Sequence, residues 1–292
     1  MPRFSVLQEI QSLDPVRDHV RIQHLSTGFE FSWDTVRALE VALYRTYCVP
    51  GISALLARTG EFTSHPQRRY DDTAIIIAEL CEWGYESERG RAALERMNFI
   101  HSHFRIPNED YLYVLSTFVF EPIRWNARFG WRLMHENEKQ ASFHFWREVG
   151  RRMGIADIPG TFDALERFSR AYEEQHFRYA DSNARIGAAT RELFVSWFPR
   201  FLAPMIRKSV HAMLDDRMRE AFGFPEPSAS LTFVLDFCLT MRGRIVRFLP
   251  PRRQAHFFTD NPNRTHPGGY DITHLGPSRM EQGTTLQMPP NG

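Results

Sequence analysis

A histidine lies on an apolar helical face of this 292-residue chain, and its placement is the strongest chemical signal in the sequence. Steps of three, four and three residues, which define one face of an α-helix, connect Leu94, Met97, His101 and Phe104. The His101 side chain therefore points in the same direction as the hydrophobic residues. A neutral imidazole in such surroundings can be the axial ligand of a haem iron, and it can equally be a hydrogen-bonded core residue. Spacing alone leaves both interpretations open.

A polar cluster precedes this histidine on the neighbouring helical segment. Arg69 and Thr73 are four residues apart and share a face, and Asp72 lies beside them. A threonine hydroxyl can donate to bound dioxygen, and an arginine held by a carboxylate can stabilise developing negative charge or pair with a haem propionate. We therefore expect Arg69, Asp72 and Thr73 to be catalytic, with Arg69 and Thr73 also contacting the cofactor. The same residue types are ordinary in the first turn of a helix, so a structural role stays open.

Other metal sites have weaker support. His103 lies about 200° around the helix from His101, so the two cannot hold one ion from a single face. A di-iron bundle needs two Glu-x-x-His motifs and two further glutamates, and only Glu173-x-x-His176 is convincing. The sequence has no Gly-rich phosphate loop, G-x-S-x-G motif or H-E-x-x-H motif, which excludes the common nucleotide-binding, hydrolase and metalloprotease classes.

The composition is that of a soluble globular protein with an aromatic core. The 24 Phe, 9 Tyr and 6 Trp residues predict an interior able to enclose a flat or lipophilic guest, or simply a Phe-rich core. A net charge of +1 without a basic stripe argues against nucleic acid as a partner. The three dispersed cysteines, Cys48, Cys81 and Cys238, are predicted to be buried free thiols of a reducing compartment. No run of about 18 apolar residues and no secretory signal is present, so we expect a cytoplasmic protein without an integral membrane segment.

Helical periodicity recurs from Trp33 onward and strand patterns are sparse, so the predicted fold class is all-α. Pro122 is expected to kink or break a long apolar helix that starts at Asn108. Residues 1–249 are predicted to form one helical domain, followed by an irregular tail over residues 250–292. Predicted helices cover residues 34–49, the short stretch around 55–56, 70–83, 87–104, 108–121, 124–133, 136–153, 163–176, 183–197, 204–221 and 230–248, with a polar loop at 60–67.

From Tyr44 to about Thr190, half of the chain resembles the MpaB / rubber oxygenase family, which includes the latex-clearing proteins and a fungal enzyme that oxidatively cleaves a farnesyl side chain. The order and spacing of several blocks together carry the resemblance. These blocks are Tyr-Arg-Thr-Tyr-Cys-Val-Pro-Gly-Ile-Ser at 44–53, Arg69-x-x-Asp72-Thr73, Arg96-Met-Asn-Phe-Ile-His101, Ile106-Pro-Asn-Glu-Asp-Tyr-Leu-Tyr113, Glu121-Pro-Ile-Arg-Trp125, and 143–153 with Trp146 and Gly150.

The resemblance implies a globin-like helical core around haem b, with additional helices enclosing the haem pocket. It implies that His101 is the proximal ligand and that Arg69 and Thr73 are the distal arginine and threonine. In latex-clearing proteins a distal lysine lies next to the threonine that corresponds to Thr73. This chain has Asp72 at the lysine position. The closed state of those proteins, in which the lysine binds the iron, therefore cannot form through this residue. Glu61 is a weak counterpart of their distal glutamate. Unlike the fungal enzyme, the sequence shows no N-terminal membrane anchor.

These observations lead to one main hypothesis and two alternatives. The main hypothesis is a haem-b-dependent oxygenase that acts with O2 on a small lipophilic substrate, through oxidative cleavage of a C=C bond in an isoprenoid-like chain. Its aromatic wall is expected to include Phe118, Phe120 and Trp125. The first alternative is a haem-binding sensor or carrier without catalytic activity. The second is a metal-free helical protein in which these residues are structural. The oligomeric state does not follow from the sequence.

Overall fold

The computed structural model describes residues 2–277, in which fourteen α-helices and four short π or 3-10 segments form the fold and no strand occurs. The predicted all-α class is therefore confirmed. No helix within this range is long and apolar enough to cross a membrane. The cytoplasmic location expected from the sequence stays a prediction.

The helices vary from one turn to six turns in length. Their bounds are α1 Ser5–Ser12, α2 His19–Leu25, α3 Ser32–Tyr47, α4 Pro50–Thr59, α5 Glu61–Ser64, α6 Pro66–Trp83, α7 Glu88–Ser102, α8 Asn108–Phe129, α9 Glu136–Arg152, α10 Phe162–His176, α11 Asp181–Ser196, α12 Ala203–Met213, α13 Asp216–Phe222 and α14 Ala229–Phe248. The short segments are η1 Ser26–Glu30, η2 Arg200–Leu202, η3 Phe258–Asp260 and η4 Ile272–His274.

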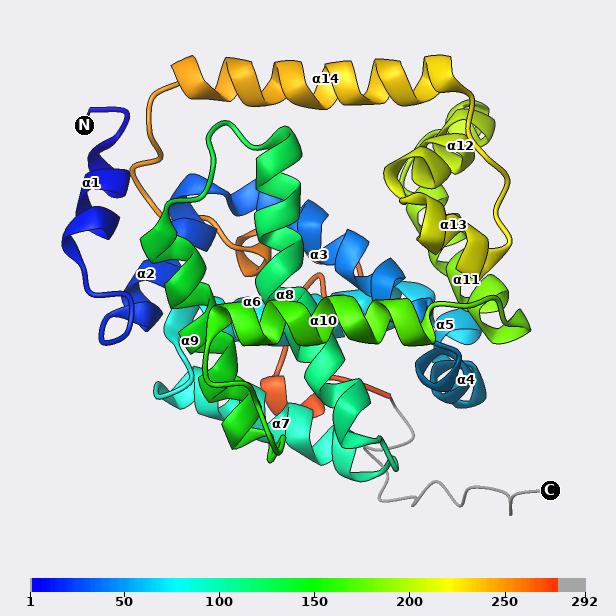
Figure 1. Ribbon diagram of the computed structural model, residues 1–292, viewed down its shortest axis with the longest axis horizontal. Coiled ribbons are helices and arrows are strands. Elements are labelled where there is room, and N and C mark those ends of the chain that lie inside the picture. The colour runs from blue at the N-terminus through cyan, green and yellow to red at the C-terminus, as the bar shows by residue number, and fades with distance from the viewer. Residues whose placement is uncertain (1, 278–292) are drawn as a thin grey trace.

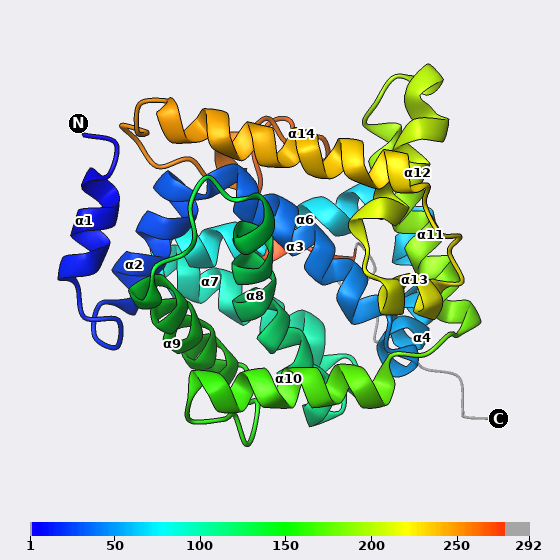
Figure 2. The ribbon, with the colours of Figure 1, turned by 45° about the horizontal axis from the view of Figure 1, so that its top comes forward.

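Helices α3 and α8 cross in the middle of the molecule and pack on each other more extensively than any other pair in the described range. Helix α9 packs on α2 and α8, and α6 packs on α7. Helix α14 lies across one side, where it contacts α12 at one end and α8 further along (Figure 1 and Figure 2). The main core lies where α6, α7, α8 and α9 meet.

Buried ion pairs tie the central helices together. The Arg45 guanidinium on α3 lies 2.9 Å from Glu121 on α8, 3.3 Å from Glu173 on α10 and 2.8 Å from Asp215 at the start of α13. Arg124 on α8 also contacts Glu121 and Glu173. Removing one member of such a cluster leaves a buried charge uncompensated, which typically costs ~3–5 kcal/mol. The cluster therefore fixes how three long helices cross.

The N-terminal helices are absent from the sequence-based prediction, which begins at Trp33. Helices α1 and α2 are only eight and seven residues long, too short for a convincing period, yet Ile10, Ile22 and Leu25 are buried against Ala141 on α9. Tertiary burial, rather than local propensity, stabilises these short helices.

Proline and glycine positions account for most of the other differences between the predicted helices and the helices of the structure. The predicted loop at 60–67 is wrong, because Gly60 with φ 72° ends α4 and Pro66 then starts α6 one turn earlier than expected. Of the kink or break predicted at Pro122, the break is wrong, because α8 runs through the proline. Buried Phe120 and Trp125 hold the helix on both sides of the proline. The predicted helix 204–221 is divided near Leu214, where the Asp215 side chain caps α13.

The chain beyond α14 returns to the body of the molecule. Residues 250–277 contain η3 and η4, and Phe257 and Leu275 are buried in the main core. The part of the predicted irregular tail from 278 to 292 lies outside the described residues. The cysteines are all free, but the prediction that all are buried is wrong, because Cys238 is exposed on α14.

Candidate active site

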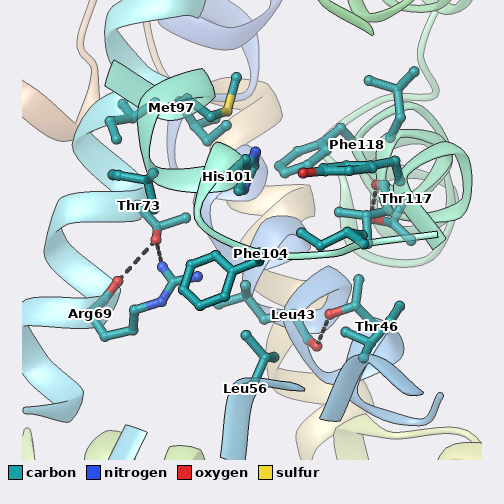
Figure 3. A pocket seen from close by; sticks show the side chains of 18 of the residues that line it. Leu43, Thr46, Leu56, Arg69, Thr73, Met97, His101, Phe104, Thr117 and Phe118 are labelled. Atoms are coloured by element: carbon teal, nitrogen blue, oxygen red, sulfur yellow. Dashed lines mark hydrogen bonds between the residues drawn. The ribbon is translucent and has the colours of Figure 1, made fainter. Parts of the chain in front are cut away.

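An apolar cavity of about 250 Å³ lies between α3, α4, α6, α7, α8 and α9, with the C-terminal segment as part of its wall. Figure 3 shows its interior, with aliphatic, aromatic and a few polar side chains converging on one space. The residues that bound it include Leu39, Ala42, Leu43, Thr46, Leu55, Leu56, Arg69, Thr73, Ile76, Met97, His101, Phe104, Val114, Thr117, Phe118, Trp146, Val149, Gly276 and Pro277. Apolar walls with a few convergent polar groups are typical of ligand sites.

His101 projects from the last turn of α7 into this cavity, as its spacing predicts (Figure 3). Its Nδ1 is buried and has no hydrogen-bond partner among residues 2–277. The Tyr111 ring meets the imidazole edge to face, with ring centroids 5.4 Å apart. Burial, with the nearby Arg69 charge, lowers the pKa of His101 to about 4. The imidazole is therefore neutral at physiological pH, and a nitrogen lone pair is available to a ligand.

The neighbouring histidine lies on another face of the same helix end. His103 Nδ1 lies 2.8 Å from the backbone oxygen of Phe99, and its ring packs against the Phe99 ring. His103 does not line the cavity. The two histidines thus provide a natural pair for comparison, one facing the cavity and one facing away.

Arg69 and Thr73 lie together on α6 and face the same cavity as His101 (Figure 3). The Arg69 Nη1 group donates to Thr73 Oγ1, and that hydroxyl donates in turn to the backbone oxygen of Arg69 at 3.0 Å. The guanidinium carbon also lies 5.3 Å from the centre of the Phe62 ring. Because the hydroxyl proton of Thr73 is already used, Arg69 is the stronger donor toward the cavity.

Asp72 lines the cavity, but its contacts differ from those expected. Its carboxylate accepts from the backbone N–H of Gly276 at 2.8 Å, lies 2.7 Å from His266 Nε2 and lies 3.5 Å from Arg68 Nε. The expectation that Asp72 holds Arg69 is therefore corrected: in the described range it binds the C-terminal segment, while Arg69 pairs with Thr73. The physical reason is that Asp72 precedes Thr73 by one residue, about 100° around α6, and points toward the returning chain.

A family model described as the catalytic domain of ER-bound oxygenase mpaB/B' and rubber oxygenase matches residues 35–244. The chain belongs to this family. The match runs from α3 to α14, and so extends beyond the Tyr44 to Thr190 region that carries the resemblance in the sequence.

Curated relatives agree with this family assignment. The chain is 30% identical over 225 residues to ER-bound oxygenase mpaB of Penicillium roqueforti, covering 70% of this chain and 75% of that protein. It is 29% identical over 259 residues to ER-bound oxygenase mpaB' of Penicillium brevicompactum, covering 82% of this chain and 61% of that protein. ER-bound oxygenase mpaB of the same species is 28% identical, over 82% of this chain and 59% of that protein. The chain thus spans about three-fifths of the length of the two P. brevicompactum relatives.

The blocks that carry the resemblance to the mpaB and rubber oxygenase family divide into two groups in space. Arg45, Glu121 and Arg124 form the buried ion cluster and do not line the cavity. Arg69, Thr73 and His101 line the cavity instead. These blocks therefore contain both residues that hold the helices together and residues that line the cavity.

The aromatic wall predicted from the sequence is partly wrong. Phe118 lines the cavity and stacks on Trp146 with ring centroids 4.6 Å apart. Phe120 packs against Phe162 instead, and the Trp125 indole donates to Asp34 at 3.0 Å, so neither bounds the cavity. On α8, Phe120 lies about 200° around the helix from Phe118, whereas Trp125 lies on nearly the same face but about two turns further along, beyond the cavity.

Several site residues lack a clear signal in the sequence. Thr46 and Thr117 add hydroxyls to the wall, but each donates to a carbonyl of its own helix, as serine and threonine commonly do. Gly276 has φ +102°, and a Cβ there would lie 2.7 Å from Ile100 of the cavity wall, so a glycine is required. Glu61, the weak candidate for a distal glutamate, does line the cavity.

The rival metal motif is divided between two structural roles. Glu173 belongs to the buried ion cluster, and His176 stacks on the Tyr172 ring at 4.1 Å. Across residues 2–277, no group of three or more His, Cys, Asp or Glu side chains is placed to hold a metal ion. Coordination in the cavity would therefore rest on the single imidazole of His101.

Proposed function

We propose that this chain is a haem-b-dependent oxygenase that acts with O2 on a small lipophilic substrate, with His101 as the axial ligand of the iron. One observation carries the proposal: a neutral imidazole without a hydrogen-bond partner in the described chain projects into an apolar cavity that also contains Arg69 and Thr73. A buried polar atom without a partner costs ~1–3 kcal/mol, and metal ligation with a hydrogen-bonded second shell is one way to recover it.

The donor set suits haem better than a bare metal ion. Haem brings four nitrogen ligands of its own, so the single imidazole of His101 would be enough to hold it. A protein-bound zinc or di-iron centre needs three or more side-chain ligands, which the described residues do not gather. When bound, haem provides the iron at which O2 is activated.

The residues around the cavity have distinct proposed roles. His101 holds and orients the iron, and its neutral form leaves the lone pair free. Arg69 presents a permanent positive charge and unused N–H donors where negative charge develops on oxygen. Thr73 orients the Arg69 guanidinium, and rotation of its hydroxyl would free a second donor. Asp72 is proposed to position the Gly276 wall, in place of the direct catalytic role expected from the sequence.

The substrate class follows from the lining of the cavity. Leucine, isoleucine, methionine and aromatic side chains make up most of the wall, which favours a lipophilic molecule and excludes water from the reacting centre. We propose oxidative cleavage of a C=C bond in an isoprenoid-like chain as the reaction.

The direct test is a visible absorption titration of the purified protein with haem. Wild type is expected to give a Soret band that saturates near one haem per chain. His101→Ala should lose this band, whereas the matched variant His103→Ala, two residues away and outside the cavity, should keep it. Equal binding by both variants would rule out His101 as the ligand.

Two measurements distinguish an oxygenase from the alternatives. The haem-loaded protein should consume O2 in the presence of an unsaturated isoprenoid such as squalene, with oxygenated fragments detected by mass spectrometry. A protein that binds haem but consumes no O2 with any isoprenoid tested would be the sensor or carrier. A protein that stays colourless after haem addition would be the metal-free alternative.

A further inference from the structure

The outward face of α14 is largely apolar, interrupted by Arg244 near its C-terminal end, on a helix that spans about 30 Å. In the described chain nothing covers this face: Phe233 is 70% exposed, Phe237 56% and Phe248 86%. Helical spacing puts the exposed side chains on one stripe, made up of Phe233, Val234, Phe237, Cys238, Ile245 and Phe248. We call these six residues the α14 stripe.

The opposite face of α14 is fixed against the body of the molecule. Gly243 is buried, and a Cβ there would lie 2.6 Å from the Phe129 carbonyl at the end of α8, so the two helices approach as closely as backbone allows. Arg242 forms an ion pair with Asp34 on α3 at 2.6 Å and lies 4.0 Å from the centre of the Trp33 ring. The α14 stripe therefore cannot turn inward without breaking these contacts.

This pattern is unusual for a helix on the surface of a globular protein. Such a helix is normally apolar on its inner face and polar on its outer face, and a continuous apolar patch left exposed marks a docking surface. Helix α14 lies along one side of the molecule in Figure 1 and Figure 2, and no residue of the stripe lines the cavity. It is therefore a second apolar surface, separate from the candidate active site.

Arginines surround the C-terminal end of the stripe. Arg244 and Arg247 lie on the last turns of α14, and Arg252 and Arg253 follow it; all four are exposed. No carboxylate within residues 2–277 forms an ion pair with any of them. Apolar side chains flanked by exposed cations suit a partner with an apolar interior beneath a negatively charged surface.

We propose that α14 docks this protein on the surface of an anionic lipid bilayer. The stripe enters the boundary between headgroups and acyl chains, with the helix axis parallel to the membrane plane, and the four arginines contact lipid phosphates and carboxylates. The helix carries too many charges to span the bilayer, so the contact is peripheral. This inference does not depend on haem binding.

Charge favours a membrane over a second copy of the chain. A contact between two α14 helices would offer these arginines no free carboxylate from the helix itself. The one acidic residue of α14, Asp236, is already held by Arg128 at 2.7 Å. Anionic lipid provides the missing negative charge without rearrangement of the protein.

Vesicle co-sedimentation of the full chain tests the proposal. The wild type is incubated with vesicles of phosphatidylcholine alone or mixed with phosphatidylserine, at low and high salt. It should bind the mixed vesicles, less strongly at high salt. The double variant Phe237→Gln/Phe248→Gln should bind more than about 100-fold less tightly, since two buried phenyl groups are lost. The affinity of the double variant Arg244→Gln/Arg247→Gln for the mixed vesicles should be roughly 30-fold lower than that of the wild type.

Control variants replace residues of the same types, an apolar residue and a pair of arginines, on parts of the surface away from α14. Val16→Gln replaces an exposed apolar residue between α1 and α2, and Arg17→Gln/Arg91→Gln replaces two exposed arginines away from α14. These controls should bind vesicles as the wild type does, and all variants should keep the wild-type circular dichroism spectrum. The arginine pair gives an independent result if the phenylalanine pair does not fold.

Three outcomes would overturn the proposal. In the first, wild type remains in the supernatant with mixed vesicles. In the second, both α14 double variants bind them as tightly as the controls. In the third, sedimentation velocity shows that the wild type is a dimer and that Phe237→Gln/Phe248→Gln is a monomer, and the wild-type dimer does not bind vesicles. Loss of haem binding in His101→Ala with vesicle binding retained would show that this surface and the cavity act separately.

Discussion

The cavity and the α14 stripe are both apolar surfaces that the described chain leaves open, but they differ in shape and in the placement of charge. The cavity is concave, and its polar groups, Arg69, Thr73 and His101, converge on one space. The α14 stripe is convex, and its charges, such as Arg244 and Arg247, lie beside it and point to solvent.

This difference indicates the kind of partner each surface accepts. A concave surface can surround a small molecule and orient it with a few polar contacts. A convex helix cannot enclose a small molecule and buries its apolar face against an extended surface, such as a bilayer. The amount of exposed apolar area alone would not separate the two functions, whereas the position of the polar groups does.

The largest effect should come from removing the imidazole. His101→Gly is expected to lower haem affinity roughly 1000-fold or more, because the iron loses its protein ligand, and added imidazole should restore the Soret band. Phe237→Gln on α14 should leave haem affinity unchanged. Haem binding by His101→Gly at wild-type affinity without imidazole would contradict the proposed ligand.

The next largest effect should come from the cavity cation. Arg69→Leu is expected to lower the O2-consumption rate about 100- to 1000-fold while haem still binds, because a preorganised positive charge near developing negative charge is lost. Thr73→Val should lower the O2-consumption rate by less, about tenfold, because Thr73 acts only by orienting the Arg69 guanidinium. The exposed arginine Arg58→Leu on α4 is the control. An unchanged rate in Arg69→Leu would exclude Arg69 from catalysis.

A substitution under α14 tests whether the stripe is held outward. Gly243→Val should lower the free energy of unfolding by about 2–3 kcal/mol, because its side chain would collide with the end of α8. Gly268→Val, where the space around the glycine is open, should cost much less. Urea denaturation measures both variants, and equal stabilities would mean that α14 is not tightly seated.

The contact between Asp72 and the C-terminal segment should contribute less. Asp72→Asn is expected to cost about 1–2 kcal/mol, because the charge facing His266 and Arg68 is lost, and to speed proteolysis within 265–277. Asp271→Asn, an exposed carboxylate on the same segment, is the matched control. Identical cleavage rates for the two variants would show that Asp72 does not hold this wall.

The smallest expected effect is on the stability of the protein when a stripe residue is truncated. Phe237→Ala should change the free energy of unfolding by less than about 0.5 kcal/mol without vesicles, because its ring is already exposed. Phe145→Ala, at a fully buried position, should cost about 3–5 kcal/mol. A large loss in Phe237→Ala would indicate that the ring packs inside the protein.

Local patterns predicted the parts of this molecule that local physics determines. The direction of His101 follows from the helical period, and the Arg69–Thr73 pair follows from a four-residue step on α6. Contacts between distant segments were not predictable in the same way. His266 meets Asp72 across 194 positions, and no period in the sequence relates the two.

The same reasoning explains the errors on helices. Pro122 was expected to kink or break α8, but the helix continues through it, because a helix packed on several neighbours tolerates one missing hydrogen bond. The exposure of Cys238 was missed because an apolar stripe in the sequence does not say whether anything covers it. Sequence periodicity reports that a face is apolar, and only the assembled fold reports what lies against it.

The origin of the cavity wall also bears on the order in which the protein is built. Gly276, which contacts Asp72 across 204 positions, leaves the ribosome long after α6 and α7 have emerged. Until then, the chamber beside the imidazole lacks one of its sides. A molecule bound there before residue 276 is synthesised would therefore not be fully enclosed.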